Sequence, residues 1–163
     1  MRQKQERYEK QFDYYKSFIS NRFWNYDIED NAFVLMKDSK GVIASVHSTA
    51  TQWEHRFKLE ITLEKALLEL NGILSGTKSY GKETLTIISR NRNFINEKKG
   101  KKVYYFTKDN SWQNEIDKFS KIIVNNKKVS DGNSLEALKV MKIISKIYSS
   151  DKVWMKKIRN YRK

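Results

Sequence analysis

Hydrophobic and polar residues alternate along the middle of the chain and follow a helical spacing in its last third. In residues 57–63, every second residue is Phe, Leu or Ile, and the residues between them are Lys, Glu and Thr. This period of two is typical of a strand with one wet face. Similar runs, none of them broken by proline, predict strands at residues 16–24, 31–37, 42–50, 66–70, 84–90 and 102–107. Between the second and third of these, the segment Asp38 to Gly41 predicts a hairpin turn, because glycine adopts the backbone conformations that tight turns need.

The last third of the sequence predicts two amphipathic helices. In the first, Asn110 or Ser111 caps the start and Asn126 marks the end. In the second, Asn133 caps the start and Glu136 follows three residues later, as in a capping box. The first helix carries an apolar stripe of Trp112, Ile116, Phe119 and Ile123, and the second a broad face of Leu135, Leu138, Met141, Ile144 and Tyr148 that predicts a well-buried helix.

Consecutive strands followed by helices indicate an α+β domain, with an open-faced, mainly antiparallel sheet and helices packed on one face. We expect the helices to cover the face that carries Phe57, Leu59 and Ile61. The opposite face then bears Lys58, Glu60, Thr62, Thr84, Thr86 and His47. Such a half-polar face is available to another subunit, so the sequence predicts a homodimer formed through it about a two-fold axis.

The length of 163 residues suits one domain with short appendages. We predict a poorly ordered or helical N-terminal extension at 1–16, the sheet domain at 17–151 and a basic tail at 152–163. The absence of cysteine excludes disulfides and thiolate metal sites. The sequence shows neither a signal peptide nor an apolar run near the roughly 18 residues of a membrane span, so we expect a cytoplasmic protein that does not bind membranes.

The net charge of +14 raises the question of nucleic-acid binding. Only eight of the 33 basic residues are arginine, and the lysines are spread along the chain, which favours solvated lysines over a phosphate-binding surface. A basic RNA-binding domain therefore stays an alternative, as does a standalone dimeric module that scaffolds other chains.

Few residues of the sequence are suited to catalysis or to binding a metal, nucleotide or sugar. His47 and His55 do not form a metal-binding pattern, and His47 is expected as a hydrogen-bonded sheet residue. The acidic residues Asp27, Glu29 and Asp30 are expected to shape a loop, although a raised pKa would suit one of them to acid–base work. The six glycines form no dinucleotide or phosphate-binding motif. Three tryptophans, Trp24, Trp53 and Trp112, could stack on a sugar or a base, or pack in the core.

Several segments resemble the C-terminal domain of the Gfo/Idh/MocA oxidoreductases, a family named after glucose-fructose oxidoreductase and inositol dehydrogenase. They are residues 24–33, 41–48, Gln52-Trp53, Phe57, Tyr80-Gly81, 134–140 and 147–150. The likeness extends over about residues 17–151. It implies an enzyme whose N-terminal Rossmann domain binds NAD or NADP, while this open-faced sheet domain contributes substrate contacts and oligomer interfaces.

The sequence departs from the family where the chemistry lies. A chain without proline cannot contain the Glu-Lys-Pro segment that carries the family's catalytic lysine, and the family's glycine-rich helix has no counterpart. The segment Leu63 to Ala66 also replaces a turn in which relatives have glycine. We therefore expect a fragment or separate subunit, encoded by its own gene or by a truncated reading frame, that binds no cofactor alone and pairs with a Rossmann-domain chain. The resemblance and the polar loop together make Trp53, His55 and Arg56 the expected substrate contacts, and no residue is predicted to be catalytic.

Overall fold

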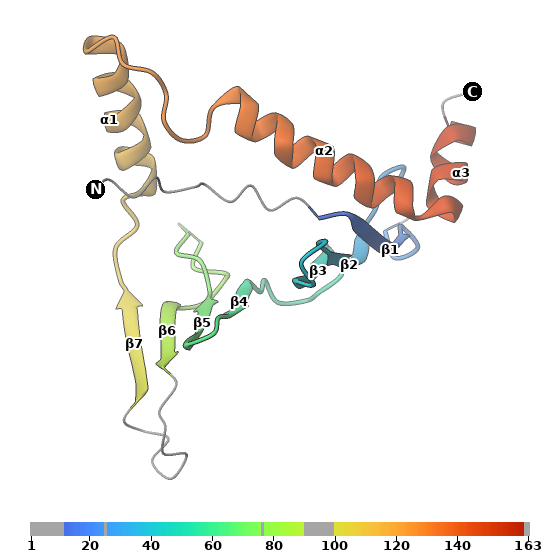
Figure 1. Cartoon of the computed structure of the whole chain (residues 1–163), viewed down its shortest axis with the longest axis horizontal. Helices are drawn as coiled ribbons and strands as arrows, with labels where there is room; N and C mark the ends of the chain where they lie inside the picture. The colour runs from blue at the N-terminus through green and yellow to red at the C-terminus, as the bar shows by residue number, and fades with distance from the viewer. Residues whose placement is uncertain (1–11, 25, 76, 90–99, 162–163) are drawn as a thin grey trace. The chain divides into compact units, whose positions relative to one another are not determined.

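A computed structural model describes residues 12–24, 26–75, 77–89 and 100–161 of the chain. These residues form seven strands and three helices (Figure 1). They divide into two compact units. The first unit combines the chain up to Thr51 with the segment from Val129 onward, and the second unit is Gln52–Lys128. Most of the predicted N-terminal extension lies outside the described residues.

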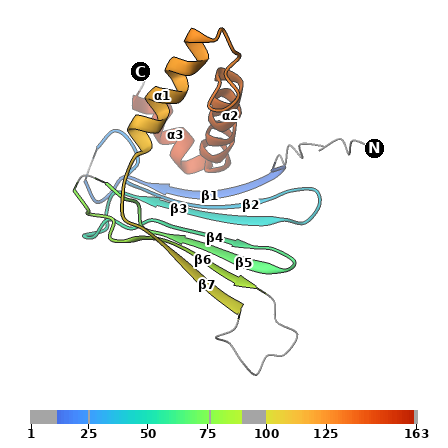
Figure 2. The same cartoon turned by 90° about the vertical axis from the view of Figure 1, so that its left-hand side faces the viewer.

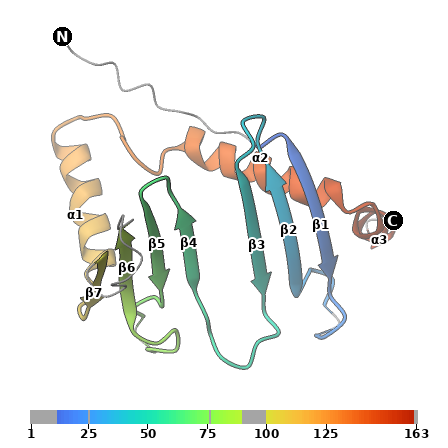
Figure 3. The ribbon, with the colours of Figure 1, turned by 60° about the horizontal axis from the view of Figure 1, so that its bottom comes forward.

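The first unit contains a three-stranded antiparallel sheet. Its strands are β1 (Tyr14–Ser20), β2 (Asn31–Lys37) and β3 (Ile43–Thr49), in the order β1-β2-β3 (Figure 3). The second and third predicted strands are confirmed. The first is displaced, because it begins at Tyr14 and ends four residues before the predicted Trp24.

The early end of β1 has a local cause in a buried carboxylate. The Oδ2 atom of Asp30 accepts hydrogen bonds from the backbone N–H groups of Phe23 at 2.8 Å and Trp24 at 2.9 Å. Asp30 is itself buried. These bonds hold residues 22–24 in a turn, so the apolar residues there do not extend the strand.

The hairpin between β2 and β3 forms as predicted. The Oδ1 atom of Asp38 accepts hydrogen bonds from the backbone N–H groups of Lys40 and Val42, at 2.9 and 2.8 Å. Gly41 adopts a positive φ of 87°, which glycine tolerates without steric cost. The buried Asp38 side chain and the permissive glycine together define the register of the hairpin.

Two helices complete the first unit, α2 (Ser134–Ser150) and α3 (Lys152–Tyr161). Helix α2 lies across one face of the sheet and packs against β1 (Figure 2). The Ser17 hydroxyl donates a hydrogen bond of 2.7 Å to the backbone carbonyl of Ile147 in α2. Val34 and Met36 of β2 are buried, and so is Trp154 of α3. This sheet and the two helices therefore share a small apolar core.

Helix α2 begins with the predicted cap but is less buried than predicted. The Asn133 side chain accepts hydrogen bonds from the N–H groups of Leu135 and Glu136, while the Glu136 carboxylate accepts one from Gly132. Only the second half of the helix lies on β1, so Leu135, Leu138 and Met141 remain about half exposed or more. No residue of α2 is fully buried, so the prediction of a well-buried helix was wrong.

The second unit contains a four-stranded antiparallel sheet and helix α1 (Ser111–Val124). The strands are β4 (Lys58–Thr62), β5 (Ala66–Asn71), β6 (Glu83–Ser89) and β7 (Lys101–Phe106), and they pair in chain order. In β4, Leu59 and Ile61 point to one face, and Lys58, Glu60 and Thr62 to the other. The predicted alternation in β4 is confirmed.

Helix α1 begins and ends where the sequence predicts, with one change at its start. Asn110 is the N-terminal flanking residue, but its side chain makes no capping bond. Instead the Asp109 carboxylate accepts hydrogen bonds from the Ser111 backbone N–H at 3.0 Å and from its hydroxyl at 2.6 Å. These two bonds lower the pKa of Asp109. The apolar stripe of α1 is exposed, from 55% at Phe119 to 77% at Trp112.

The α+β class and the antiparallel pairing are confirmed, but the strands form two sheets instead of one. Helix α2 packs against β1 of its own unit, and the covering of the Leu59 and Ile61 face by the two helices stays a prediction. The division at residues 16 and 151 stays a prediction. Residues 152–161, expected as part of a basic tail, are helical, and the buried Trp154 anchors them.

Candidate functional site

The candidate site lies in the second unit, where two loops meet. One loop leads into β4 and contains the expected residues Trp53, His55 and Arg56, and the other joins β5 to β6. The two loops are joined where the second begins, because the backbone N–H of Gly72 donates a hydrogen bond of 3.0 Å to the carbonyl of Phe57. A pocket can therefore form from segments that are distant in sequence.

Histidine and hydroxyl groups form a chain of contacts across the two loops. The His55 Nδ1 atom lies 2.7 Å from the Ser79 hydroxyl, which lies 2.9 Å from the hydroxyl of Thr77. The His55 ring also contacts the ring of Tyr80, with 4.9 Å between centroids. These contacts fix the orientation of the imidazole. Its second ring nitrogen, Nε2, donates a hydrogen bond in one tautomer and accepts one in the other.

The loops enclose an open hollow of about 550 Å³. Its wall combines aromatic rings with polar groups, and Trp53 is 90% exposed there. The lining residues are Trp53, Glu54, His55, Lys78, Ser79, Tyr80 and Gly81. Exposed rings beside hydroxyl and imidazole groups match the chemistry of a sugar, which has one apolar face and a rim of hydroxyls.

The structure places two of the three expected residues in this hollow and separates the third from its lining. Trp53 and His55 line the hollow. Arg56 instead lies 3.6 Å from the carboxylate of Glu54, and both side chains are largely exposed. Ser79 and Lys78 line the site although the sequence did not predict them there. Tyr80 and Gly81 belonged to the family resemblance, but the separation of 24 residues from His55 to Ser79 gave no sign of a contact between the two loops.

Two residues of the acidic cluster before β2, Glu29 and Asp30, form hydrogen bonds within the first unit. Asp30 holds the turn after β1, as described above, and the Glu29 carboxylate accepts a hydrogen bond from the hydroxyl of Tyr148 in α2. Burial, and secondly the Glu29 carboxylate, raise the pKa of the Tyr148 hydroxyl above its ordinary value. These contacts support the structural interpretation of Glu29 and Asp30.

The remaining aromatic and histidine candidates also have local partners. The indole Nε1 of Trp24 donates a hydrogen bond of 2.8 Å to the carbonyl of Ala50. His47 Nε2 lies 3.1 Å from the Asn31 side-chain oxygen, and its ring stacks on Phe33 with 3.9 Å between centroids. His47 is therefore a hydrogen-bonded sheet residue, as predicted.

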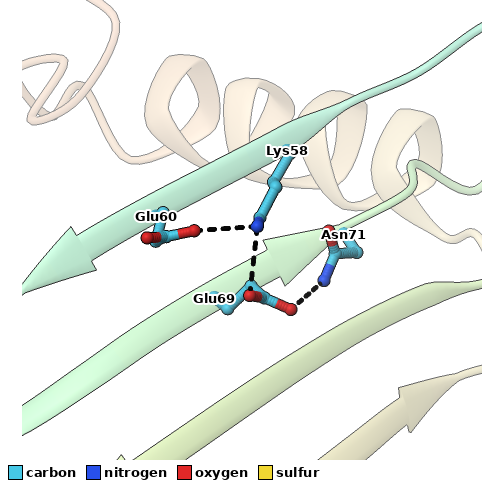
Figure 4. Close-up of polar contacts among 4 residues, drawn as sticks. All are labelled: Lys58, Glu60, Glu69 and Asn71. Atoms are coloured by element: carbon cyan, nitrogen blue, oxygen red, sulfur yellow. Dashed lines mark hydrogen bonds and ion pairs between the residues drawn. The ribbon is translucent and has the colours of Figure 1, made fainter. Parts of the chain in front are cut away.

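A charged cluster occupies the polar face of the second sheet (Figure 4). The Lys58 ammonium lies 2.8 Å from the Glu60 carboxylate and 3.3 Å from that of Glu69. Hydrogen bonds to Glu60 and then Glu69 raise the pKa of Lys58. The Asn71 amide and then Lys58 lower the pKa of Glu69 by bonding to its charged form. This cluster confirms that Lys58 and Glu60 share a face opposite Leu59.

The face of the first sheet opposite α2 is largely apolar and exposed. The strand register places Phe18 beside Phe33 and His47, in one row across the three strands. Its large apolar residues are 51% to 70% exposed. They are Tyr14, Phe18, Phe33, Leu35 and Ile43. This face combines aromatic and aliphatic groups with the single stacked histidine.

Metal sites, membrane-spanning helices and dinucleotide sites each need an arrangement that the described residues do not form. In residues 12–24, 26–75, 77–89 and 100–161, no three His, Asp or Glu residues come together as a metal site would need. In the same residues, no helix combines the length and apolar character that a membrane crossing requires. All strand pairs described are antiparallel, so these residues do not form the parallel βαβ unit that holds a dinucleotide.

The fold is similar to part of a known dehydrogenase. The chain aligns with the structure of UDP-N-acetylglucosamine 3-dehydrogenase GnnA from Acidithiobacillus ferrooxidans with a TM-score of 0.54 and 16% sequence identity. The match covers 74% of this chain and 36% of that enzyme, so the chain spans about a third of its length. No protein-family model and no curated protein sequence matches the chain.

Proposed function

We propose that this chain is the substrate-side and assembly domain of a sugar-type NAD(P)-dependent oxidoreductase of the Gfo/Idh/MocA type. The observation that carries the proposal is the fold likeness to a UDP-N-acetylglucosamine dehydrogenase over 74% of the chain. The family resemblance of the sequence, which rests on residues such as Trp53 and Tyr80, supports the same assignment independently of the fold.

The hollow in the second unit is the proposed substrate contact. The exposed ring of Trp53 offers a flat surface for the apolar face of a sugar. His55 and Ser79, already oriented by their mutual contact, offer hydrogen bonds to sugar hydroxyls, and the Lys78 ammonium suits an anionic group attached to the sugar. These residues bind and orient the sugar, and they do not transfer hydride.

The dinucleotide belongs to a different domain in this proposal. The described residues do not fit NAD or NADP, because their sheets are antiparallel and lack the phosphate-binding turn of a Rossmann fold. When bound by such a domain, the cofactor supplies the hydride chemistry. This chain then closes the substrate side of a shared active site and is inactive when it is alone.

The assembly role rests on the uncovered sheet faces. The exposed residues Phe18, Phe33 and Leu35 form an apolar surface of the kind that interfaces bury. The polar face of the second sheet carries the Lys58 cluster, in which the ammonium and both carboxylates already have a charged partner. We assign the homodimer to these faces, about a two-fold axis.

Titration with UDP-N-acetylglucosamine, free N-acetylglucosamine and UDP, followed by saturation-transfer NMR and calorimetry, tests the sugar site. We expect Trp53→Ala to weaken binding about tenfold, equivalent to about 1.4 kcal/mol. Trp112→Ala is the matched control, because Trp112 is an exposed tryptophan on α1 and does not line the hollow. Equal loss in the two variants, or no sugar binding by the unaltered chain, contradicts the proposed site.

Titration of the same protein with NADH tests whether the dinucleotide binds to a different domain and not to this chain. We expect no saturable binding, because the dinucleotide-binding unit is assigned elsewhere. Saturable binding of NADH by this chain alone would contradict the proposal.

Light scattering tests the dimer by measuring the molecular mass of two variants. Leu35→Asp changes the sheet face, and Ile116→Asp changes another exposed apolar surface, on α1. A dimer that survives the first change and not the second rules out the sheet face.

A further inference from the structure

The outer strand of the second sheet, β7, has an unusual edge. It pairs with β6 and with no other strand among the described residues. All six of its residues are exposed, and four of them are the large residues Val103, Tyr104, Tyr105 and Phe106. An edge strand presents unpaired backbone N–H and C=O groups, which can pair with another strand.

Both faces of β7 carry apolar or aromatic side chains. The register with β6 places Tyr104 opposite Leu85 on one face, and Tyr105 opposite Thr84 on the other. The opposite edge strand, β4, differs because it alternates and carries the Lys58–Glu60 ion pair on its polar face. Aromatic residues on both sides of an edge strand favour a neighbouring strand that contacts them on each face.

We propose that β7 pairs with β7 of a second copy of this chain, in antiparallel orientation about a two-fold axis that passes midway between the Tyr104 residues of the two copies. The axis is perpendicular to the sheet, so residues on one face stay on that face. Tyr104 then lies opposite Tyr104 of the second copy, Val103 opposite Tyr105, and Lys102 opposite Phe106. The two four-stranded sheets join into one antiparallel sheet.

Charge selects this orientation over a parallel one. The two lysines of β7, Lys101 and Lys102, both lie at its N-terminal end. Parallel pairing in register would align the lysines of the two copies, which is unfavourable. Antiparallel pairing separates them by the length of the strand and sets Lys102 beside the ring of Phe106, where a cation is attracted to the aromatic face.

Pairing of β7 with a second copy of this chain also gives a closed interface. Pairing of β7 with β7 uses the same edge on both molecules, so this interface joins two copies and leaves no β7 edge free. Pairing of β7 with the β4 edge of another molecule would leave two free edges and continue into a filament. The charged β4 strand opposes that outcome, because charged side chains, lysine above all, are a common protection of edge strands.

Cysteine cross-linking tests the pairing, because the chain contains no other cysteine. Directly opposite residues of an antiparallel pair have Cα atoms about 4.5–5.5 Å apart, within disulfide reach. Under mild oxidation, Tyr104→Cys is expected to form at least about tenfold more disulfide-linked dimer than Val103→Cys or Tyr105→Cys alone, whose cysteines are offset by two residues, roughly 7 Å along the strand. Trp112→Cys on α1 is the control for random collision.

A mixture of Val103→Cys and Tyr105→Cys chains tests the register directly. These residues lie opposite each other, so the mixture is expected to cross-link although each variant alone does not. Cross-linking of Val103→Cys alone, or equal cross-linking of Tyr104→Cys and Trp112→Cys, overturns the proposal. A dimer that light scattering detects but that Tyr104→Cys does not capture also overturns it, while leaving the sheet-face dimer of the proposed function intact.

Discussion

The side chain of Asp151 accepts a hydrogen bond from the backbone N–H of Ile19, at 2.8 Å between Oδ2 and nitrogen, although 132 residues separate them in the sequence. The other carboxylate oxygen accepts a bond of 2.9 Å from the N–H of Trp154. One side chain therefore caps the start of α3 and binds strand β1. It links the N-terminal strand of the first unit to the helices that lie more than a hundred residues later.

Replacement of Asp151 by alanine should destabilise the first unit. Loss of a helix cap costs about 1 kcal/mol, and a strand N–H left without a partner costs about 1–3 kcal/mol. We expect the free energy of unfolding, measured in urea, to fall by about 2–4 kcal/mol. Glu64→Ala, in an exposed turn, is the control and should change it by less than about 0.5 kcal/mol. Equal effects of the two changes would contradict this role of Asp151.

Gly72 is predicted to be far less tolerant of substitution than Gly41. Both have positive φ, 71° and 87°. A Cβ atom at Gly72 would lie 2.3 Å from the carbonyl oxygen of Lys82, whereas one at Gly41 would have nothing within 4 Å. Gly41→Ala should cost about 1–2 kcal/mol from backbone strain alone. Gly72→Ala should cost clearly more in urea unfolding and should open the hollow between the loops.

The reverse order of stability for these two glycine variants would show that the backbone at Lys82 moves freely. That result would also weaken the proposed site, because the bond from Gly72 to Phe57 sets the separation of its two loops.

The strands and helices were predictable where a local pattern decides them. Alternation located β4 and the hairpin of β2 and β3, and the pair Asn133 and Glu136 located the start of α2. The end of β1 was not predictable, because it depends on the buried Asp30 carboxylate rather than on the apolar residues after Ser20. The burial of α2 was overestimated because an apolar face shows what a helix could bury, and not the extent of the surface it meets.

The candidate site was predictable only in its first loop. Trp53 and His55 stood out as aromatic and titratable residues in a polar segment, and both line the hollow. Ser79 and Lys78 joined them through the antiparallel pairing of β4 with β5, which places the start of β4 beside the end of β5 and so brings the loop after β5 to the loop before β4. Arg56 shared the same sequence signal as His55, but its partner is Glu54. Which of several polar neighbours faces a pocket depends on side-chain direction, which a single sequence does not specify.

Tyr148 should make the stability of the first unit sensitive to alkali. Burial and the neighbouring Glu29 raise its pKa in the folded state, so above about pH 10 the unfolded chain loses this proton first. Its stabilising contribution is complete below that pH and is lost as the pH rises towards the folded-state pKa. Unfolding in urea at pH 8 and pH 10.5 should show a smaller alkaline loss for Tyr148→Phe than for the unaltered chain. Tyr26→Phe, an exposed tyrosine, should not reduce the loss.

Glu69 should act in the opposite direction, at low pH. The Asn71 amide and the Lys58 ammonium bond to its charged form and lower its pKa, so its contribution is complete above the ordinary carboxyl pKa of about 4.3 and is lost as the pH falls through the folded-state value. Thermal unfolding of Glu69→Gln should therefore differ from the unaltered chain at pH 7 and converge with it near pH 2. Because the cluster is exposed, the difference at pH 7 should be a few degrees at most and should shrink in 1 M salt. A difference that stays constant from pH 7 to pH 2 would show that Glu69 acts by packing instead of charge.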